Sequence, residues 1–302
     1  MEVLSMISYG KAEYIAELKI MWHTIFGDTE SYLNSFFDKV YKDENTLVDI
    51  EDGNVVSVLF MIPYKFKVNG QENKIVYLYA LATDPAYRGR KIMSKLIEKS
   101  LDISTKRGYA LSVLIPADDS LFEYYRQFGF EEYFDRIMIT KTIADIENEQ
   151  TNKGFEIQEI GQLPMKLIKA DANQIWSAYS HSAIFDSEGI VLSKEQNEYY
   201  IEELKSEGGQ AVIFKMSGNK DGYALLQLHD DNLLILETNV DADNLKLFYE
   251  ALYRKYKFKA VTFYQPICFD EEAIRPYRKS FAMAKSLNGI SVKNPFINRV
   301  LM

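Results

Sequence analysis

The feature that most constrains the fold is a pattern of helical and extended segments that occurs twice along the 302 residues. Each half begins with amphipathic segments in which apolar residues recur at the spacing of a helix with one buried face. Three segments of alternating polarity follow, then a helical segment, a continuous apolar segment and a short helix. A chain of this length suits two domains of about 150 residues each. The pattern therefore predicts two copies of one fold.

In the first half the pattern predicts a helix over 11–26, a second helix capped by Asp28, strands over 45–51, 54–63 and 74–83, a helix over 91–106, a buried strand over 109–115, a short helix capped by Asp118 or Asp119, and a strand near 133–140. The polar stretch 145–153 is typical of a linker.

In the second half the pattern predicts a strand over 154–160, helices over 164–180 and 193–206, strands over 210–216, 221–229 and 232–239, a helix over 242–256, a strand over 259–265, a short helix over 271–278, and strands over 280–286 and 296–301.

The order of these elements defines the expected fold class. The passage from the third strand through a helix to the buried strand requires a right-handed crossover between parallel strands. We therefore expect two tandem domains of the α/β (α+β) class, over residues 1–145 and 154–302. Each would be a mixed, mostly antiparallel twisted sheet flanked by helices.

Composition and charge limit the classes of function. Apolar residues make up 47% of the chain, which supports large cores, and no apolar run is long enough to span a membrane. The first residues lack a basic region followed by an apolar stretch, so we expect no secretory signal. The single cysteine, Cys268, forms no internal disulfide, which fits a cytoplasmic protein. The net charge of −9 disfavours nucleic acid as a partner and favours a cation such as an amine.

One strand-to-helix junction in the first half carries three closely spaced cations. The strand ends at Asp84-Pro85, and Arg88-Gly89-Arg90-Lys91 stands directly before the helix. The N-terminus of a helix is already positive, so added cations are unfavourable there unless a multiply charged anion binds. Gly89 allows the backbone to approach such an anion closely. On the charge pattern alone, a solvated basic loop is an equal alternative.

This junction resembles the pyrophosphate-binding motif of GNAT acetyltransferases, R-x-x-G-x-G/A after a strand that ends in V-x-P. Thr83-Asp84-Pro85 corresponds to the strand end. Lys91 stands where glycine is usual, and its side chain either crowds the backbone or adds a phosphate contact. Met93 replaces a small residue, as in a subset that resembles the enhanced-intracellular-survival acetyltransferases. The resemblance implies that the pyrophosphate of acetyl-CoA is bound by Arg88, Gly89, Arg90, Lys91, Ile92 and Met93.

The same resemblance implies how the rest of the cosubstrate binds and reacts. In GNAT enzymes the strand before the loop splays from its neighbour, and pantetheine pairs with the backbone that this exposes, here that of Leu81, Ala82 and Thr83. A deprotonated amine then attacks the thioester directly, and the bound geometry supplies much of the rate. Backbone N–H groups of the splayed strand stabilise the oxyanion. Acetyl-CoA is thus the expected cosubstrate, with no metal.

A second match to the family lies in residues 121–130. GNAT proteins often carry a tyrosine four residues before a Gly-Phe pair, on the short helix after the buried strand, and Tyr125 holds that place. The resemblance implies that its phenol protonates the departing CoA thiolate. Packing is the alternative role, and we expect it of the neighbouring Tyr124. Asp118 stands where Asn is common, and it either contacts the cofactor or only caps the helix.

The sequence does not determine the general base. Glu72, Tyr77 and Tyr79 could each reach the cleft or a water molecule in it, whereas His23 is expected to pack on its helix. The terminal carboxylate of Met302 is a further candidate, because the intracellular-survival-like enzymes use theirs.

The second half lacks the cationic loop. At the corresponding junction, residues 236–244 contain no arginine and no glycine, and Asp241 and Asp243 would repel a phosphate. We therefore expect a degenerate copy that binds no CoA and walls the acceptor cleft. Glu237 either presents a carboxylate to an amine or lies on a solvated strand face.

These features favour an N-acetyltransferase that moves an acetyl group from acetyl-CoA to a primary amine of a small molecule or peptide. Two alternatives stay open: a non-catalytic acyl-CoA-binding module, and a tandem-GNAT aminoacyl transferase that uses charged tRNA. The net charge of −9 argues against the tRNA-dependent enzyme. The acceptor and the oligomeric state stay open, and a homo-oligomer is compatible with the sequence.

Overall fold

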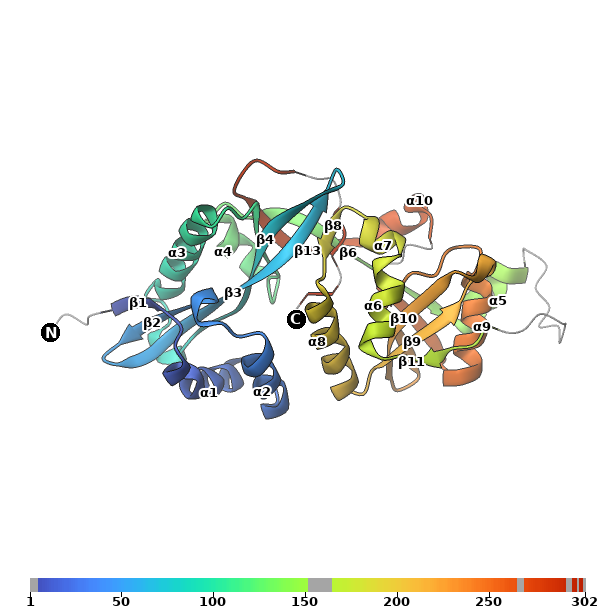
Figure 1. Cartoon of the computed structure of the whole chain (residues 1–302), viewed down its shortest axis with the longest axis horizontal. Coiled ribbons are helices and arrows are strands. Elements are labelled where there is room, and N and C mark those ends of the chain that lie inside the picture. The colour runs from blue at the N-terminus through green and yellow to red at the C-terminus, as the bar shows by residue number, and fades with distance from the viewer. Residues whose placement is uncertain (1–4, 152–164, 265–268, 292–294, 298, 301–302) are drawn as a thin grey trace. The chain divides into compact units, whose positions relative to one another are not determined.

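The chain forms two compact units (Figure 1). The first contains Met1–Phe134 and Phe281–Lys293, and the second contains Asp135–Ser280 and Asn294–Val300. The computed structural model describes residues 5–151, 165–264, 269–291, 295–297 and 299–300. The strand predicted over 154–160, Cys268 and Met302 therefore lie outside the described residues.

These units do not coincide with the domains 1–145 and 154–302 that the sequence predicts. Strand β6 (Glu131–Thr142) passes from the first unit into the second after Phe134. Strand β13 (Arg278–Ser286) belongs to the first unit from Phe281 onward, because its residues 283–286 pair antiparallel with β5 (Leu111–Leu114). A strand late in the chain thus satisfies backbone groups of the first unit's sheet, which no local sequence pattern reveals.

The elements of the first unit are β1 (Ser5–Tyr9), α1 (Ile15–Phe26), α2 (Glu30–Lys39), β2 (Thr46–Glu51), β3 (Asn54–Val68), β4 (Gln71–Thr83), α3 (Ile92–Lys106), β5, α4 (Ser120–Arg126) and β13. The strands follow the order β1-β2-β3-β4-β5-β13. β4 and β5 are parallel, and α3 connects them, as the crossover predicts.

Two tight turns define the meander of β2, β3 and β4. Asp52-Gly53 and Asn69-Gly70 have positive φ at both central residues, as in the turns that suit right-twisted hairpins. Both turns were expected from the sequence. The second keeps β3 and β4 paired up to Val68 and Gln71, so both strands are longer than the predicted 54–63 and 74–83.

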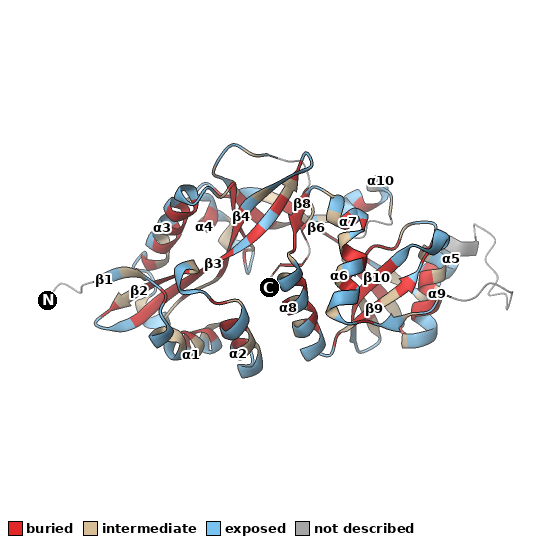
Figure 2. Ribbon diagram, viewed as in Figure 1, coloured by how far each residue is buried: buried red, intermediate tan, exposed pale blue. Residues whose placement is uncertain are grey.

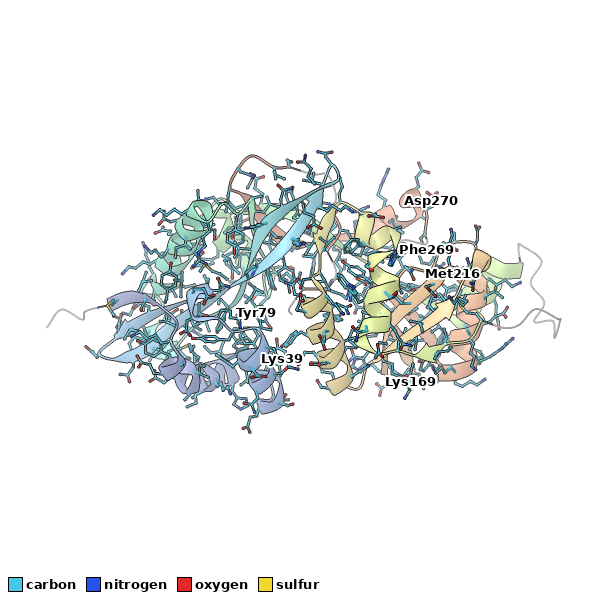
Figure 3. All side chains as sticks on the ribbon, viewed as in Figure 1. Lys39, Tyr79, Lys169, Met216, Phe269 and Asp270 are labelled. Carbon is cyan, nitrogen blue, oxygen red and sulfur yellow. The ribbon has the colours of Figure 1, made fainter. Side chains whose placement is uncertain are left out.

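Helices cover both faces of this sheet (Figure 1). On one face, Leu59 and Met61 of β3 and Leu78 of β4 pack with buried side chains of α3 and α4. On the opposite face, Phe60 and Tyr79 contact aromatic rings of α1 and α2. Most of β3 is buried (Figure 2), and Tyr79 of β4 is labelled in Figure 3. Because neighbouring residues of a strand point to opposite faces, alternate residues of β3 serve two separate layers.

Trp22 is the centre of the aromatic cluster that holds α1 and α2 against the sheet. Its ring centroid lies 4.7 Å from that of Phe36 and 5.3 Å from that of Phe60. Its indole Nε1 donates to the carboxylate of Asp28 at 2.7 Å. The prediction that Asp28 caps α2 is therefore wrong: Thr29 is the cap, and its hydroxyl accepts from a backbone N–H of the first turn at 3.2 Å.

The elements of the second unit are β6, α5 (Ile143–Thr151), β7 (Ile168–Lys169), α6 (Ala172–Ser180), α7 (Ala183–Asp186), β8 (Gly189–Val191), α8 (Lys194–Ser206), β9 (Gln210–Lys215), β10 (Asp221–His229), β11 (Asn232–Thr238), α9 (Leu245–Tyr256), β12 (Ala260–Tyr264) and α10 (Glu271–Ile274). The strands follow the order β6-β12-β11-β10-β9-β7, and β11 and β12 are parallel with α9 between them in the chain. In both units, helices are thus followed by a three-strand meander, a crossover helix and a strand parallel to the last strand of the meander.

Several segments of the second unit differ from expectation, among them α7 and β8, which the sequence did not predict. The predicted linker is helical as far as Thr151, because Thr142 and Asp145 hydrogen bond each other's backbone N–H groups and start α5. Helix α6 begins at Ala172 instead of 164, where Asp171 forms a capping box. In the described part of 296–301, Phe296 makes only an isolated bridge to Gly189 instead of a strand.

The core of the second unit contains an ion pair. Glu237 of β11 is 2% exposed, and its carboxylate lies 2.9 Å from Arg299 Nε and accepts from the Tyr223 hydroxyl at 2.6 Å. Arg299 also donates to Asn197 at 2.7 Å, and its guanidinium lies 4.3 Å from the ring centroid of Tyr179. The carboxylate is thus neither offered to an amine nor solvated, which overturns both roles that the sequence suggested.

We predict that Arg299→Met lowers the free energy of unfolding by about 3–5 kcal/mol, because it leaves a buried carboxylate without its counterion. Arg254→Met is the control: Arg254 pairs with Glu250 on the surface, and its loss should cost less than about 1 kcal/mol. Urea unfolding measures both values. A cost for Arg299→Met no larger than that of the control would contradict this account of the core.

Candidate functional site

The end of β4 departs from a regular sheet. Ala80 has a φ of 45°, and the register with β3 shifts between Val58 and Phe60, so β4 holds an extra residue there. Such a bulge bends its strand and interrupts the ladder. On the other side, pairing with β5 ends at Tyr77, although β4 continues to Thr83. The ladder thus ends six residues before β4 does, as expected if the strand end is splayed in the way that the resemblance implies.

Ser57 of β3 fixes the splayed end of β4. Its buried hydroxyl donates to the carbonyl oxygen of Ala82 at 2.8 Å and is hydrogen bonded to the hydroxyl of Thr83, also at 2.8 Å. These bonds hold the end of β4 against β3. The other edge of residues 81–83, which faces away from β3, lies beyond the point where pairing with β5 ends. A ligand could therefore pair with it.

The loop after β4 leads into α3 through left-handed backbone. Arg88 Nε donates to the carbonyl oxygen of Thr83 at 3.3 Å, which folds the loop back on the strand. Gly89 and Lys91 have φ of 78° and 58°, a region that glycine occupies without cost and lysine does not. No side chain of the described residues caps α3, so its first N–H groups point out of the helix at the loop.

A pocket of ≈ 380 Å³ lies where β4, this loop, α3 and α4 meet. It is formed within the first unit. Its lining contains most of the residues that the sequence selected, namely Leu81, Ala82, Thr83, Arg88, Gly89, Lys91, Ile92, Met93 and Tyr125. The structure thus gathers residues from three separate stretches of sequence around one cavity.

Both tyrosines of α4 line this pocket. Tyr125 is 7% exposed and packs edge-on against Phe130. Burial raises the pKa of Tyr125 above its ordinary value, and the Tyr124 phenol and the Asp118 carboxylate raise it further. The hydroxyl therefore keeps its proton at neutral pH. Tyr124, for which we expected packing, also lines the pocket and is hydrogen bonded to Ser94 at 3.2 Å.

Two residues of the predicted site lie outside the pocket lining. The Arg90 guanidinium pairs with the buried carboxylate of Glu51 at 2.8 Å. Asp118 accepts hydrogen bonds from the backbone N–H and the hydroxyl of Ser120 at the start of α4, and these bonds lower the pKa of Asp118. Asp118 thus binds the first N–H of α4, as the capping alternative suggested, although the N-cap position itself is held by Asp119.

None of the described candidates for the general base lines the pocket. Glu72 is exposed and forms an ion pair with a lysine of β3, and Tyr77 and Tyr79 are buried in the sheet. The expectation that His23 packs is wrong, because its ring is exposed and Nδ1 lies 2.9 Å from a backbone carbonyl oxygen after α1. Met302 lies outside the described residues.

The structure adds pocket residues that the sequence did not select. Tyr87, Ser94 and Leu121 flank the two motifs, and helical spacing from Lys91 and Tyr125 would have been a signal for the last two. Ile25 comes from α1, far away in the chain, and only the packing of α1 on the sheet brings it there.

Two further observations concern features that the described residues lack. Within the described ranges, no group of three or more His, Cys, Asp or Glu side chains is placed to hold a metal ion. Over the same ranges, no helix is long and apolar enough to cross a membrane.

Comparison with known proteins relates this pocket to a family. The sequence profile of the "Acetyltransferase (GNAT) domain" matches residues 7–133, which contain every residue of the pocket. Residues 7–133 form a GNAT acetyltransferase domain. No curated protein matches the sequence.

The likeness to solved structures extends beyond the GNAT domain of residues 7–133. A conserved protein from Enterococcus faecalis V583, described as a probable N-acyltransferase, has a TM-score of 0.75 and 17% identity over 94% of this chain and 73% of its own. A GCN5-related N-acetyltransferase from Anabaena variabilis has a TM-score of 0.73 and 17% identity, with the same coverage. Eis1 from Mycobacterium abscessus has a TM-score of 0.68 and 11% identity, over 94% of this chain and 74% of its own. At these identities the likeness concerns the fold.

Lys91 offers a test of the loop geometry in this GNAT domain. Its left-handed backbone costs about 1–2 kcal/mol for a residue with a Cβ atom. We predict that the free energy of unfolding of Lys91→Gly exceeds that of Lys91→Ala by about 1 kcal/mol. Both variants lose the ammonium group, but only glycine adopts the left-handed backbone without strain. Equal stability of the two variants, measured by urea unfolding, would mean that Lys91 is not left-handed in solution.

Proposed function

We propose that the protein transfers an acetyl group from acetyl-CoA to a primary amine of a small molecule or peptide. The observation that carries the proposal is the pocket, in which the splayed end of β4, a cationic loop at a helix N-terminus and a protonated phenol converge. These parts match, in order, a linear amide-containing arm, a multiply charged phosphate ester and a thiolate leaving group. Acetyl-CoA contains all three.

The binding mode follows from the backbone. The pantetheine arm would pair with the exposed edge of residues 81–83, which Ser57 holds in place. The pyrophosphate would lie on Gly89 and the first turn of α3, where free N–H groups and the helix dipole favour negative charge. Glycine at this point permits close approach of the backbone to the phosphates.

The reaction would proceed by direct attack in a ternary complex. The neutral amine nitrogen adds to the thioester carbonyl carbon, and backbone N–H groups at the end of β4 stabilise the resulting oxyanion. The tetrahedral adduct collapses with cleavage of the C–S bond, the amine proton passes to a base, and Tyr125 donates its phenolic proton to the departing thiolate. Burial raises the pKa of a thiol as it does that of the phenol, so a thiolate that leaves in this pocket would be a stronger base than in water.

We assign no cofactor site to the second unit. β11 separates from β12 after Ile235, but beyond that point Glu237 is bound by Arg299 and Tyr223. In the connection to α9, Asp241 accepts hydrogen bonds from the backbone and side chain of a single asparagine and would repel a phosphate. A degenerate GNAT-like copy with a structural role accounts for both features.

We predict that isothermal titration detects one acetyl-CoA site per chain and that Arg88→Glu abolishes the binding, because it reverses a charge at the pocket. Lys106→Glu is the control, since Lys106 lies at the opposite end of α3 and pairs with Asp102. Two sites of equal affinity, or wild-type affinity in Arg88→Glu, would argue against this placement of the phosphates.

A screen for CoA release over polyamines, aminoglycosides, amino acids and peptides with free N-termini identifies the acceptor. Turnover with at least one amine is expected. Binding of acetyl-CoA without release of CoA from any of them would favour the non-catalytic module instead.

With that acceptor, Tyr125→Phe should reduce kcat by about 10²- to 10⁴-fold while acetyl-CoA affinity changes little, because it removes only the proton donor. The raised pKa of Tyr125 keeps the acid protonated, so kcat should show no loss from its ionisation up to about pH 10. Tyr124→Phe, which loses only the bond to Ser94, should stay near the wild-type rate. A wild-type kcat in Tyr125→Phe would exclude the acid role.

A further inference from the structure

The three cations of the loop are not equivalent. Arg90 Nη2 lies 2.9 Å from Oε1 and 2.8 Å from Oε2 of Glu51, the last residue of β2. The Glu51 side chain is 2% exposed, whereas that of Arg90 is 43% exposed. The guanidinium also lies 5.3 Å from the ring centroid of Tyr87. Arg90 is therefore held between a buried carboxylate and an aromatic face.

This pairing restrains Arg90. A buried carboxylate without a counterion is strongly unfavourable, so movement of Arg90 to a phosphate would leave Glu51 uncompensated. Arg90 directly precedes Lys91, the N-cap residue of α3. The ion pair thus ties the start of α3 to the end of β2, and it fixes the direction of the N–H groups that open the helix.

Arg88 and Lys91 are placed differently. Both line the pocket and are exposed. Among the described residues, Arg88 donates only to a neutral carbonyl oxygen, at 3.3 Å. Neither side chain forms an ion pair in the part of the chain that the structure describes, so both positive charges stay uncompensated at the pocket.

We infer, on the basis of the proposed function, that Arg90 is a positioning residue locked by Glu51, and that Arg88 and Lys91 meet the phosphate charge of the CoA thioester. Lys91 thereby supplies a side-chain cation where the family motif has a glycine, and Arg90 does not contact the ligand. Glu51 becomes a determinant of CoA affinity although it lies outside the pocket lining.

The test is acetyl-CoA titration at several salt concentrations with Glu51→Gln, Arg90→Gln, their double variant, Arg88→Gln and Lys91→Gln. Salt screens the attraction of exposed charges, so loss of a phosphate-binding cation reduces the dependence of Kd on salt. Arg88→Gln and Lys91→Gln should each reduce it. Glu51→Gln and Arg90→Gln should weaken binding by about 10- to 100-fold, the effect known for groups that orient metal ligands, and leave the salt dependence at the wild-type slope. The double variant should be no weaker than either single one.

Arg90→Lys is the conservative variant, because lysine also pairs with a carboxylate, and it should recover part of the lost affinity. The inference would be overturned if Arg90→Gln reduced the salt dependence of Kd as much as Arg88→Gln does. It would also be overturned if Glu51→Gln bound acetyl-CoA more tightly than the wild type. Should Glu51→Gln fail to fold, the slopes of the two Arg90 variants still decide. Failure of the wild type to bind acetyl-CoA would overturn the proposed function and this inference together, whereas binding with the contrary slopes would overturn the inference alone.

Discussion

The candidate site depends on one constraint: β4 stops pairing with β5 at Tyr77 and continues to Thr83. Backbone groups along a strand edge require partners, so a ladder that ends early leaves an edge on which an extended ligand can pair. The bulge at Ala80 bends the strand, and Ser57 holds the end that results. The cationic loop and α3 follow from where this strand ends, and α4 closes the pocket from the other side.

Two regions of the pocket differ in their electrostatic environment. At the loop, uncompensated cations and an uncapped helix N-terminus make a positive surface that suits phosphates. At α4, burial keeps Tyr125 neutral and protonated. The described residues of the second unit show no such arrangement, and there the carboxylate of Glu237 is neutralised inside the core. The similar order of elements therefore indicates the same fold in both units. The distribution of charge favours a cofactor site in the first unit alone.

The sequence predicted those features of the fold that depend on interactions between neighbouring residues. Asp52-Gly53 and Asn69-Gly70 require positive φ, so the meander was predictable from two dipeptides. The motif around Arg88 was recognisable for the same reason, as a short stretch with a defined geometry. The partner of Arg90 and the place of β13 were not predictable, because Glu51 and β5 lie far away in the sequence. The helix that replaces the predicted linker was missed, although Thr142 and Asp145 form a capping pair that could have revealed it.

The central claim is that acetyl-CoA binds the first unit at the splayed strand. Hydrogen–deuterium exchange with and without acetyl-CoA tests it most directly, because amides that pair with the ligand or lie beneath it exchange more slowly. The account predicts protection in residues 81–94 and 121–125, and unchanged exchange in residues 236–244 of the second unit. Protection confined to 236–244, or unchanged exchange in 81–94 at saturating ligand, would contradict it.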